Sequence, residues 1–317
     1  MDKQQSPLAP IALIVYNRPW HTRQTVDALQ KNPLSGDSDL VVFSDAAKTA
    51  AQAEAVNDVR KYIHQINGFK SVTIIERKMN FGLGRSIIDA VTRLCEEYGR
   101  VIVLEDDLVT SPYFLRFMND ALSFYENEDR VMHIAGCVYP IGDIKDETFF
   151  FRVPVPTGWA TWSRAWQHFR KSDDVMLQFD PGMRKAFTFN ESYSFWTQFE
   201  LNKSGSINTW FIYWYACLFL RGGLALFPGR SLIKNIGFDG SGLNSGTTNI
   251  YDSGLADSAI RISPIPVKES MEMVKRYERF FRRAYSPVLP LHIRIIRKIY
   301  QVIQGLALIN RSGGAGK

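Results

Sequence analysis

Short, wholly apolar segments alternate with segments of helical spacing over the first hundred residues, and this alternation restricts the fold more than any other feature. The apolar segments are residues 11–16, 40–43, 72–75 and 101–104. The helix-like segments between them are residues 22–30, 46–65 and 84–98. Short apolar strands separated by helices are typical of a parallel sheet that is covered on both faces. We therefore expect an α/β fold with a mostly parallel, Rossmann-type sheet.

Polar residues directly follow three of the predicted strands. Asn17 and Arg18 follow the first strand, Asp45 follows the second, and the acidic triplet Glu105–Asp107 follows the fourth. Ligands of doubly wound sheets bind beyond the carboxyl ends of the strands. The sequence therefore predicts that these residues gather at one ligand-binding edge.

The acidic triplet is the sharpest of these signals. Three adjacent carboxylates repel one another, and their pKa values rise unless a cation lies among them. Hard cations such as Mg²⁺ and Mn²⁺ bind carboxylate oxygens and share their remaining positions with substrate phosphates. The triplet therefore predicts a site for a metal and a diphosphate. The alternative is a solvated acidic turn before a helix that Ser111 caps.

Composition excludes several other classes of protein. Hydrophobic residues make up 45% and charged residues 22% of the 317 residues, which excludes a disordered chain. The three cysteines lie far apart, and the five histidines lack metal-ligand spacing, so neither a disulfide framework nor a zinc site is expected. The net charge of +6 suits an anionic partner, but no RNA-recognition motif is present and nucleic acid is not expected.

The pattern changes after residue 130, where aromatic residues become frequent. We expect one domain over residues 1–250, with a nucleotide-binding half (1–130) and an acceptor half (131–250), and an extension over 251–317. Residues 237–258 are rich in Gly, Ser and Asn and predict a long loop. Residues 287–309 predict a basic amphipathic helical tail, which either contacts an anionic membrane surface or packs on the protein itself.

The termini and apolar runs indicate where the protein is located. The first ten residues are polar and lack the apolar region of a signal peptide. The longest uncharged run near the C-terminus has twelve residues (299–310), whereas a membrane-spanning helix needs about 20. We expect a cytoplasmic protein, and the alternative is a peripheral protein at the inner face of the membrane.

The motifs occur in an order that resembles the GT-A-fold nucleotide-sugar glycosyltransferases. The resemblance is to bacterial sugar transferases related to N-acetylglucosaminyltransferase I, and it covers roughly residues 8–240. The acidic triplet with the following SPYFLRF is similar to the DXD-type motif of that family. The other matching segments are IALIVYNRP (11–19), LVVFSDA (40–46), MNFGLGRSIIDAV (79–91) and PTGWATWSRAW (156–166).

The resemblance implies roles for the residues of the nucleotide-binding half. Asp107 would bind Mn²⁺ or Mg²⁺, and Glu105 and Asp106 would hold the ribose, the sugar or a metal-bound water. Asp45 would accept a hydrogen bond from uracil, which favours a UDP-linked donor. Arg18 and its neighbour Asn17 would meet the ribose or phosphate.

Two further segments have a functional and a structural interpretation. Asn80 and Arg85 flank a glycine-containing turn that either approaches the diphosphate or simply starts a helix. Gly158 and Trp159 are expected to line the acceptor pocket, because aromatic rings stack on sugars. Four further tryptophans, Trp162, Trp166, Trp196 and Trp214, are expected in the core.

The catalytic base is the weakest point of the resemblance. An inverting transferase needs a base to deprotonate the acceptor hydroxyl. In the related transferase an Asp lies between two tryptophans, but the counterpart here, residues 210–214 (WFIYW), has no acid. The nearest acids in the sequence, Glu200 and Asp239, are the candidates.

Three functions follow from this interpretation. The first is a metal-dependent transferase that moves a hexosyl or N-acetylhexosaminyl group from a nucleoside-diphosphate sugar to a glycan or lipid-linked acceptor. The second is a non-catalytic nucleotide-sugar binding protein. The third is a sugar-1-phosphate nucleotidyltransferase, which should have a glycine-rich loop after the first strand, where this chain reads VYNRPWH.

Overall fold

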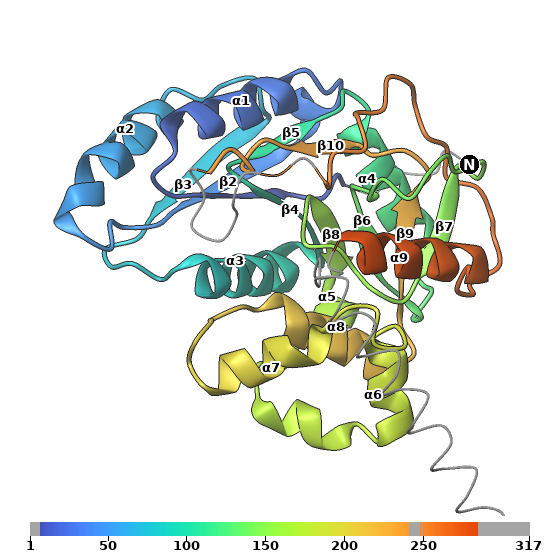
Figure 1. Ribbon diagram of the computed structural model, residues 1–317. Helices are drawn as coiled ribbons and strands as arrows, with labels where there is room; N and C mark the ends of the chain where they lie inside the picture. Colours follow the sequence, from blue (N-terminus) through green and yellow to red (C-terminus); the bar gives the residue numbers. More distant parts are fainter. Residues whose placement is uncertain (1–6, 241–247, 249, 285–317) are drawn as a thin grey trace, which may run out of the picture.

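A mixed sheet of eight strands forms the centre of the computed structural model, which describes residues 7–240, 248 and 250–284 (Figure 1). The strand order is β3-β2-β1-β4-β8-β6-β9-β7. The strands are β1 (Ile11–Val15), β2 (Asp39–Ser44), β3 (Ser71–Glu76), β4 (Arg100–Glu105), β6 (Val131–Ala135), β7 (Thr148–Phe151), β8 (Trp159–Trp162) and β9 (Leu224–Pro228). A separate two-stranded sheet pairs β5 (Leu108–Thr110) with β10 (Ile233–Asn235).

Four of the seven strand pairs in the large sheet are parallel. Strands β3, β2, β1 and β4 run parallel to one another, and β6 is parallel to β9. Strand β8 runs antiparallel between β4 and β6, and β7 pairs antiparallel with β9 at the edge. The mostly parallel α/β sheet expected from the sequence is confirmed.

Helices cover both faces of this sheet. Helices α1 (Pro19–Gln30), α2 (Ala53–Ile63) and α4 (Phe114–Phe124) pack on one face, and α3 (Leu83–Tyr98) and α5 (Ser163–Trp166) pack on the other. Helices α6 (Pro181–Phe187), α7 (Phe195–Lys203) and α8 (Phe211–Leu220) gather at the bottom of Figure 1. Helix α9 (Met271–Ala284) and short 3₁₀ turns at Ser35–Asp37, Ala50–Gln52 and Asp173–Gln178 complete the elements.

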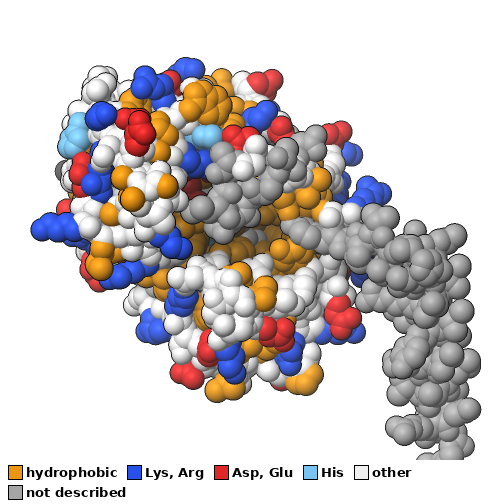
Figure 2. Space-filling model, turned by 60° about the vertical axis from the view of Figure 1, so that its left-hand side comes forward, with side chains coloured by type: hydrophobic (Ala, Val, Ile, Leu, Met, Phe, Trp, Pro, Cys, Tyr) orange, Lys and Arg blue, Asp and Glu red, His pale blue; other side chains and the backbone are white. Residues whose placement is uncertain are grey.

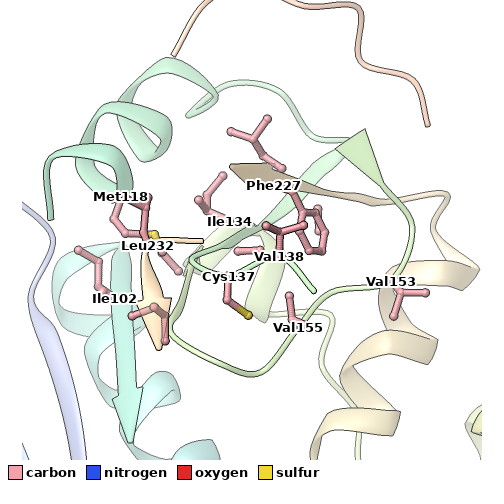
Figure 3. Close-up of a cluster of buried hydrophobic side chains, with 14 of the residues drawn as sticks. Ile102, Met118, Ile134, Cys137, Val138, Val153, Val155, Phe227 and Leu232 are labelled. Atoms are coloured by element: carbon pink, nitrogen blue, oxygen red, sulfur yellow. The ribbon is translucent and has the colours of Figure 1, made fainter. Parts of the chain in front are cut away.

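Strands β1, β2 and β4 supply buried side chains alternately to the two hydrophobic cores, one on each face of the sheet. In β1, Leu13 faces the core under α1, whereas Ile14 faces the core under α3. This period of two explains why the strands are apolar throughout: each strand is covered on both sides. Figure 3 shows part of the larger core, which includes Ile102 of β4, Met118 of α4 and Phe227 of β9.

One expected helix start is wrong, and tertiary hydrogen bonds explain the difference. Helix α2 begins at Ala53 rather than at residue 46, because the backbone of Ala46 and Lys48 is bound by the side chains of Asp45, Asn80 and Tyr16. Helix α4 begins at Phe114, after a turn in which the hydroxyl of Ser111 accepts from the backbone N–H of Tyr113 at 3.3 Å and donates to the carbonyl of Ala256. Such long-range partners leave no periodic signal in the sequence.

Helix α9 packs on the second half of the sheet and shares its core. Its buried residues include Met273, Val274 and Phe281, and the ring of Tyr277 stacks on Phe151 of β7 with 4.4 Å between ring centroids. The expected tail helix over residues 287–309 lies outside the described residues. Within the described part of the chain, no helix combines the length and apolarity needed to cross a membrane.

Candidate functional site

The carboxyl ends of β2, β1 and β4 border one cleft of about 360 Å³. These strands are parallel neighbours, so the residues after them lie side by side. The volume lies within the range of small-molecule sites. The cleft brings together seven of the predicted site residues, namely Asn17, Arg18, Asp45, Asn80, Glu105, Asp106 and Asp107.

The acidic triplet lies at the floor of this cleft with its carboxyl groups largely withdrawn from water. Asp106 accepts a hydrogen bond from the backbone N–H of Tyr16 at 3.2 Å. Burial and the charge of Asp107 raise the pKa of Asp106 to about 7, although Arg18 opposes the shift. Burial and the charges of Asp107 and Asp106 raise the pKa of Glu105 well above its ordinary value. Raised carboxyl pKa values show that the ionised forms are destabilised, so a bound cation would stabilise the carboxylates of this site.

Arg18 is a cation that the protein itself places in this cluster. Its Nη1 lies 2.8 Å from Oδ2 of Asp107 and 4.0 Å from Oδ1 of Asp106. It directly follows the turn after β1 and precedes Pro19, the first residue of α1. The fixed φ of proline and the start of the helix hold the Arg18 backbone at the mouth of the cleft.

A second segment, distant in sequence, reaches the acidic triplet through the β5–β10 pair. The backbone N–H of Ile236 donates to the carbonyl of Asp107 at 2.9 Å. Asp239 then lies 3.6 Å from Nη2 of Arg18 and 3.0 Å from Nε2 of His21. Asp239 is therefore in contact with Arg18, which lines the cleft. His21 is buried and contacts Asp239.

Asp45 is buried, and neighbouring donors already fill its acceptor positions. Its Oδ1 accepts from the backbone N–H groups of Ala46 and Phe81, and its Oδ2 accepts from Gly82 N–H and the Asn80 amide. Two carboxylate oxygens offer about four acceptor positions. The expected hydrogen bond from uracil to Asp45 therefore has no acceptor position in this structure. Asp45 instead fixes the turn that starts α3.

The first turn of α3 supplies one residue that the sequence did not single out. Ser86 lines the cleft and is 3% exposed, and its hydroxyl has no hydrogen-bond partner among the described residues. A buried hydroxyl without a partner is costly unless a ligand satisfies it. Arg85, by contrast, is exposed and lies over the ring of Phe81 at 3.9 Å, away from the cleft lining.

The predicted acceptor-side residues lie in the core instead of lining a pocket. Trp159 is 0% exposed, because its ring is stacked between His133 and Trp210, with ring centroids 5.1 Å away on each side. At Gly158 an added Cβ would lie 2.7 Å from Ile233, so close packing explains the glycine. Figure 2 shows a hollow at mid-height of the molecule in which hydrophobic side chains gather.

The second candidate base does not approach the cleft. Glu200 is exposed on α7 and is absent from the cleft lining. Of the two candidate acids, Asp239 is the one that contacts a residue of the cleft lining, Arg18. Glu200 was a candidate because of its nearness in sequence to residues 210–214. Its helix does pack against α8, where Phe199 contacts Tyr213 with 5.3 Å between ring centroids, but Glu200 itself does not line the cleft.

The cleft offers oxygen ligands suited to a hard cation, without a closed metal cage. Over the described residues, no group of three or more His, Cys, Asp or Glu side chains is arranged to hold a metal ion. Mg²⁺ is usually bound by one or two carboxylates together with substrate phosphates. The carboxylates of the triplet, and the raised pKa values of Glu105 and Asp106, fit a divalent cation of this kind.

The sequence matches no protein-family model and no curated protein. Among solved structures, S. aureus TarS aligns with 16% identity and a TM-score of 0.34, over 52% of this chain and 30% of that chain. A mannosyltransferase from Pyrobaculum calidifontis, solved with GDP-Man and Mn²⁺, aligns with 12% identity and a TM-score of 0.35, over 69% and 73%. This chain thus spans less than a third of TarS, and likenesses at these TM-scores do not assign an activity.

Proposed function

We propose that this protein is a glycosyltransferase that binds a nucleoside-diphosphate sugar together with Mn²⁺ or Mg²⁺. The observation that supports the proposal is the cleft lined by the acidic triplet and Arg18, the residue that Asp239 contacts at 3.6 Å. A site with buried carboxylates at strand ends, one guanidinium and an unsatisfied hydroxyl has the groups that a metal diphosphate requires. The proposed acceptor is a glycan or a lipid-linked sugar.

The proposed roles follow from the position of each group in the cleft. Asp107 holds the cation, which when bound neutralises charge on the diphosphate leaving group. Glu105 and Asp106 hold the ribose or the sugar. Arg18 and the hydroxyl of Ser86 hold phosphate or ribose oxygens, because both residues line the cleft.

We assign the base to Asp239, held at the cleft mouth by Arg18 and His21. Its carboxylate takes the proton of the acceptor hydroxyl while that oxygen bonds to the anomeric carbon. The bond from the anomeric carbon to the diphosphate oxygen breaks at the same time, and the nucleoside diphosphate leaves. Attack opposite the leaving group inverts the anomeric centre.

The test is binding and turnover with defined donors. Melting temperatures should rise with UDP- or GDP-sugars when Mn²⁺ is present, and should change little with the sugars in EDTA. Donors with uracil and donors with guanine both belong in the panel, because Asp45 has no acceptor position for uracil. Nucleoside diphosphate released from a bound donor separates a transferase from a non-catalytic binding protein. No metal-dependent shift with any donor would refute the proposal.

We also propose a cytoplasmic protein that contacts the anionic inner face of the membrane. Four cations, Lys275, Arg279, Arg282 and Arg283, are exposed along α9, whose apolar side is buried in the core. Such a helix can attract anionic lipid headgroups through its charges, but it has no free apolar side to insert into the bilayer. Sedimentation with anionic vesicles at low salt, and none with neutral vesicles, is the expected result. Equal sedimentation with both would contradict it.

A further inference from the structure

Arg18 faces three carboxylates from two distant parts of the chain. Its guanidinium contacts Asp107 at 2.8 Å through Nη1 and Asp239 at 3.6 Å through Nη2, and Asp106 lies at 4.0 Å. The side chains of Arg18, Asp106 and Asp107 are only 12–14% exposed. An arginine keeps its charge at any ordinary pH. Asp107 therefore already has a buried counter-ion in the protein without ligands.

The backbone encloses this ion pair. A Cβ added at Gly237 would lie 2.0 Å from Oδ2 of Asp107 and 2.9 Å from Nη1 of Arg18. The segment after β10 thus closes over the oxygen that the guanidinium contacts, and Ile236 ties it there. A second cation that uses this oxygen meets Arg18 at close range, and two cations on one carboxylate repel each other.

We infer that Arg18 is an exchangeable counter-ion that competes with the divalent cation for Asp107 until a diphosphate arrives. The inference rests on the proposed function. A diphosphate offers the guanidinium a planar, bidentate anionic partner of its own. Arg18 can then leave Asp107 for the phosphate oxygens, and Asp107 becomes available to the metal.

Coupled binding of metal and nucleotide is the consequence. A metal ion that binds alone has to break the buried ion pair between Arg18 and Asp107. When a diphosphate binds with the metal, Arg18 exchanges Asp107 for phosphate oxygens and Asp107 exchanges Arg18 for the metal. Each ligand should therefore strengthen the other by the same factor, as linkage requires, and coupling factors of roughly 5 to 150 are typical. Without Arg18 the metal has no internal competitor, and most of this coupling should disappear.

The experiment measures Mn²⁺ binding by the electron paramagnetic resonance signal of free Mn²⁺, with and without saturating UDP or GDP. Mn²⁺ bound by the nucleotide in solution is subtracted. The variants are the wild type, Arg18→Gln and Arg23→Gln. Arg23 is the matched control, because it lies in α1, the helix that directly follows Arg18, is exposed, does not line the cleft and lies 4.6 Å from the centroid of the Tyr62 ring. Circular dichroism checks that each variant is folded.

In the wild type, nucleotide should tighten Mn²⁺ binding about tenfold. Arg18→Gln should bind Mn²⁺ alone about tenfold more tightly than wild type and gain less than threefold from nucleotide, whereas Arg23→Gln should match wild type. A folded Arg18→Gln variant whose Mn²⁺ affinity is unchanged or weaker would overturn the inference. Should that variant not fold, the wild-type coupling decides, because a gain below about threefold also overturns it. If neither nucleotide binds with Mn²⁺, the proposed function itself fails.

Discussion

At the scale of single residues, the same side chain at equivalent strand ends has two different uses. Asp45 and Asp107 both follow a parallel strand at one edge of the sheet. The oxygens of Asp45 accept four hydrogen bonds from its own neighbourhood, whereas Asp107 is paired to the movable side chain of Arg18. A fixed set of backbone donors makes a structural residue, and an exchangeable partner leaves a carboxylate available to a ligand.

His133 provides a residue-scale prediction about pH. It is fully buried, accepts from Trp214 Nε1–H and donates to the carbonyl of Val155. Burial lowers the pKa of His133 to about 3, from an ordinary value of 6.5. Between these values the unfolded chain binds a proton that the folded chain does not, so the free energy of unfolding falls as pH falls.

This residue should contribute a slope of about 1.4 kcal/mol per pH unit in that interval. Urea unfolding of wild type and His133→Gln from pH 7 to pH 4 measures it. The variant should be less stable at pH 7, because a cavity and altered hydrogen bonds replace the ring, and its profile should be flatter. Parallel profiles for the two proteins would contradict this account.

At the scale of elements, the short pair β5–β10 decides whether the site is complete. In this pair, Leu108 is paired with Asn235 and Thr110 with Ile233. The pairing positions the segment that follows β10, with Gly237 and Asp239, next to the acidic triplet. Gly237 is needed there for its lack of a side chain, because its neighbours occupy the Cβ position. The requirement is close approach rather than an unusual backbone conformation.

Gly237→Ala should therefore weaken Mn²⁺-dependent nucleotide binding by at least about tenfold. The added methyl group has to push away Asp107 or Arg18, and overpacking typically costs about 1–3 kcal/mol of stability. Gly36→Ala is the control, since its Cβ would meet nothing within 4 Å. Calorimetry of UDP and GDP with Mn²⁺ provides the measurement. Equal affinities in the two variants would show that the segment does not close over Asp107 in solution.

At the scale of the whole molecule, the first half of the fold and the edge of the site were predictable from the sequence. Alternating apolar strands and helices are local patterns, and the carboxyl ends of parallel strands meet by geometry, which placed Arg18 beside the acidic triplet. The β5–β10 pair joins segments more than a hundred residues apart through strands of three residues, too short for a periodic signal. Trp159 is buried for a similar reason, because His133 and Trp210 enclose it from other elements.

The central claim is that the acidic triplet binds a metal together with a nucleoside diphosphate, and Asp107→Asn tests it most directly. Isothermal titration of UDP and GDP, each with Mn²⁺ and with EDTA, is compared for wild type, Asp107→Asn and the exposed control Asp120→Asn. We predict Mn²⁺-dependent binding in wild type and Asp120→Asn, and its loss in a folded Asp107→Asn protein. Mn²⁺-dependent binding that persists in Asp107→Asn would contradict the claim.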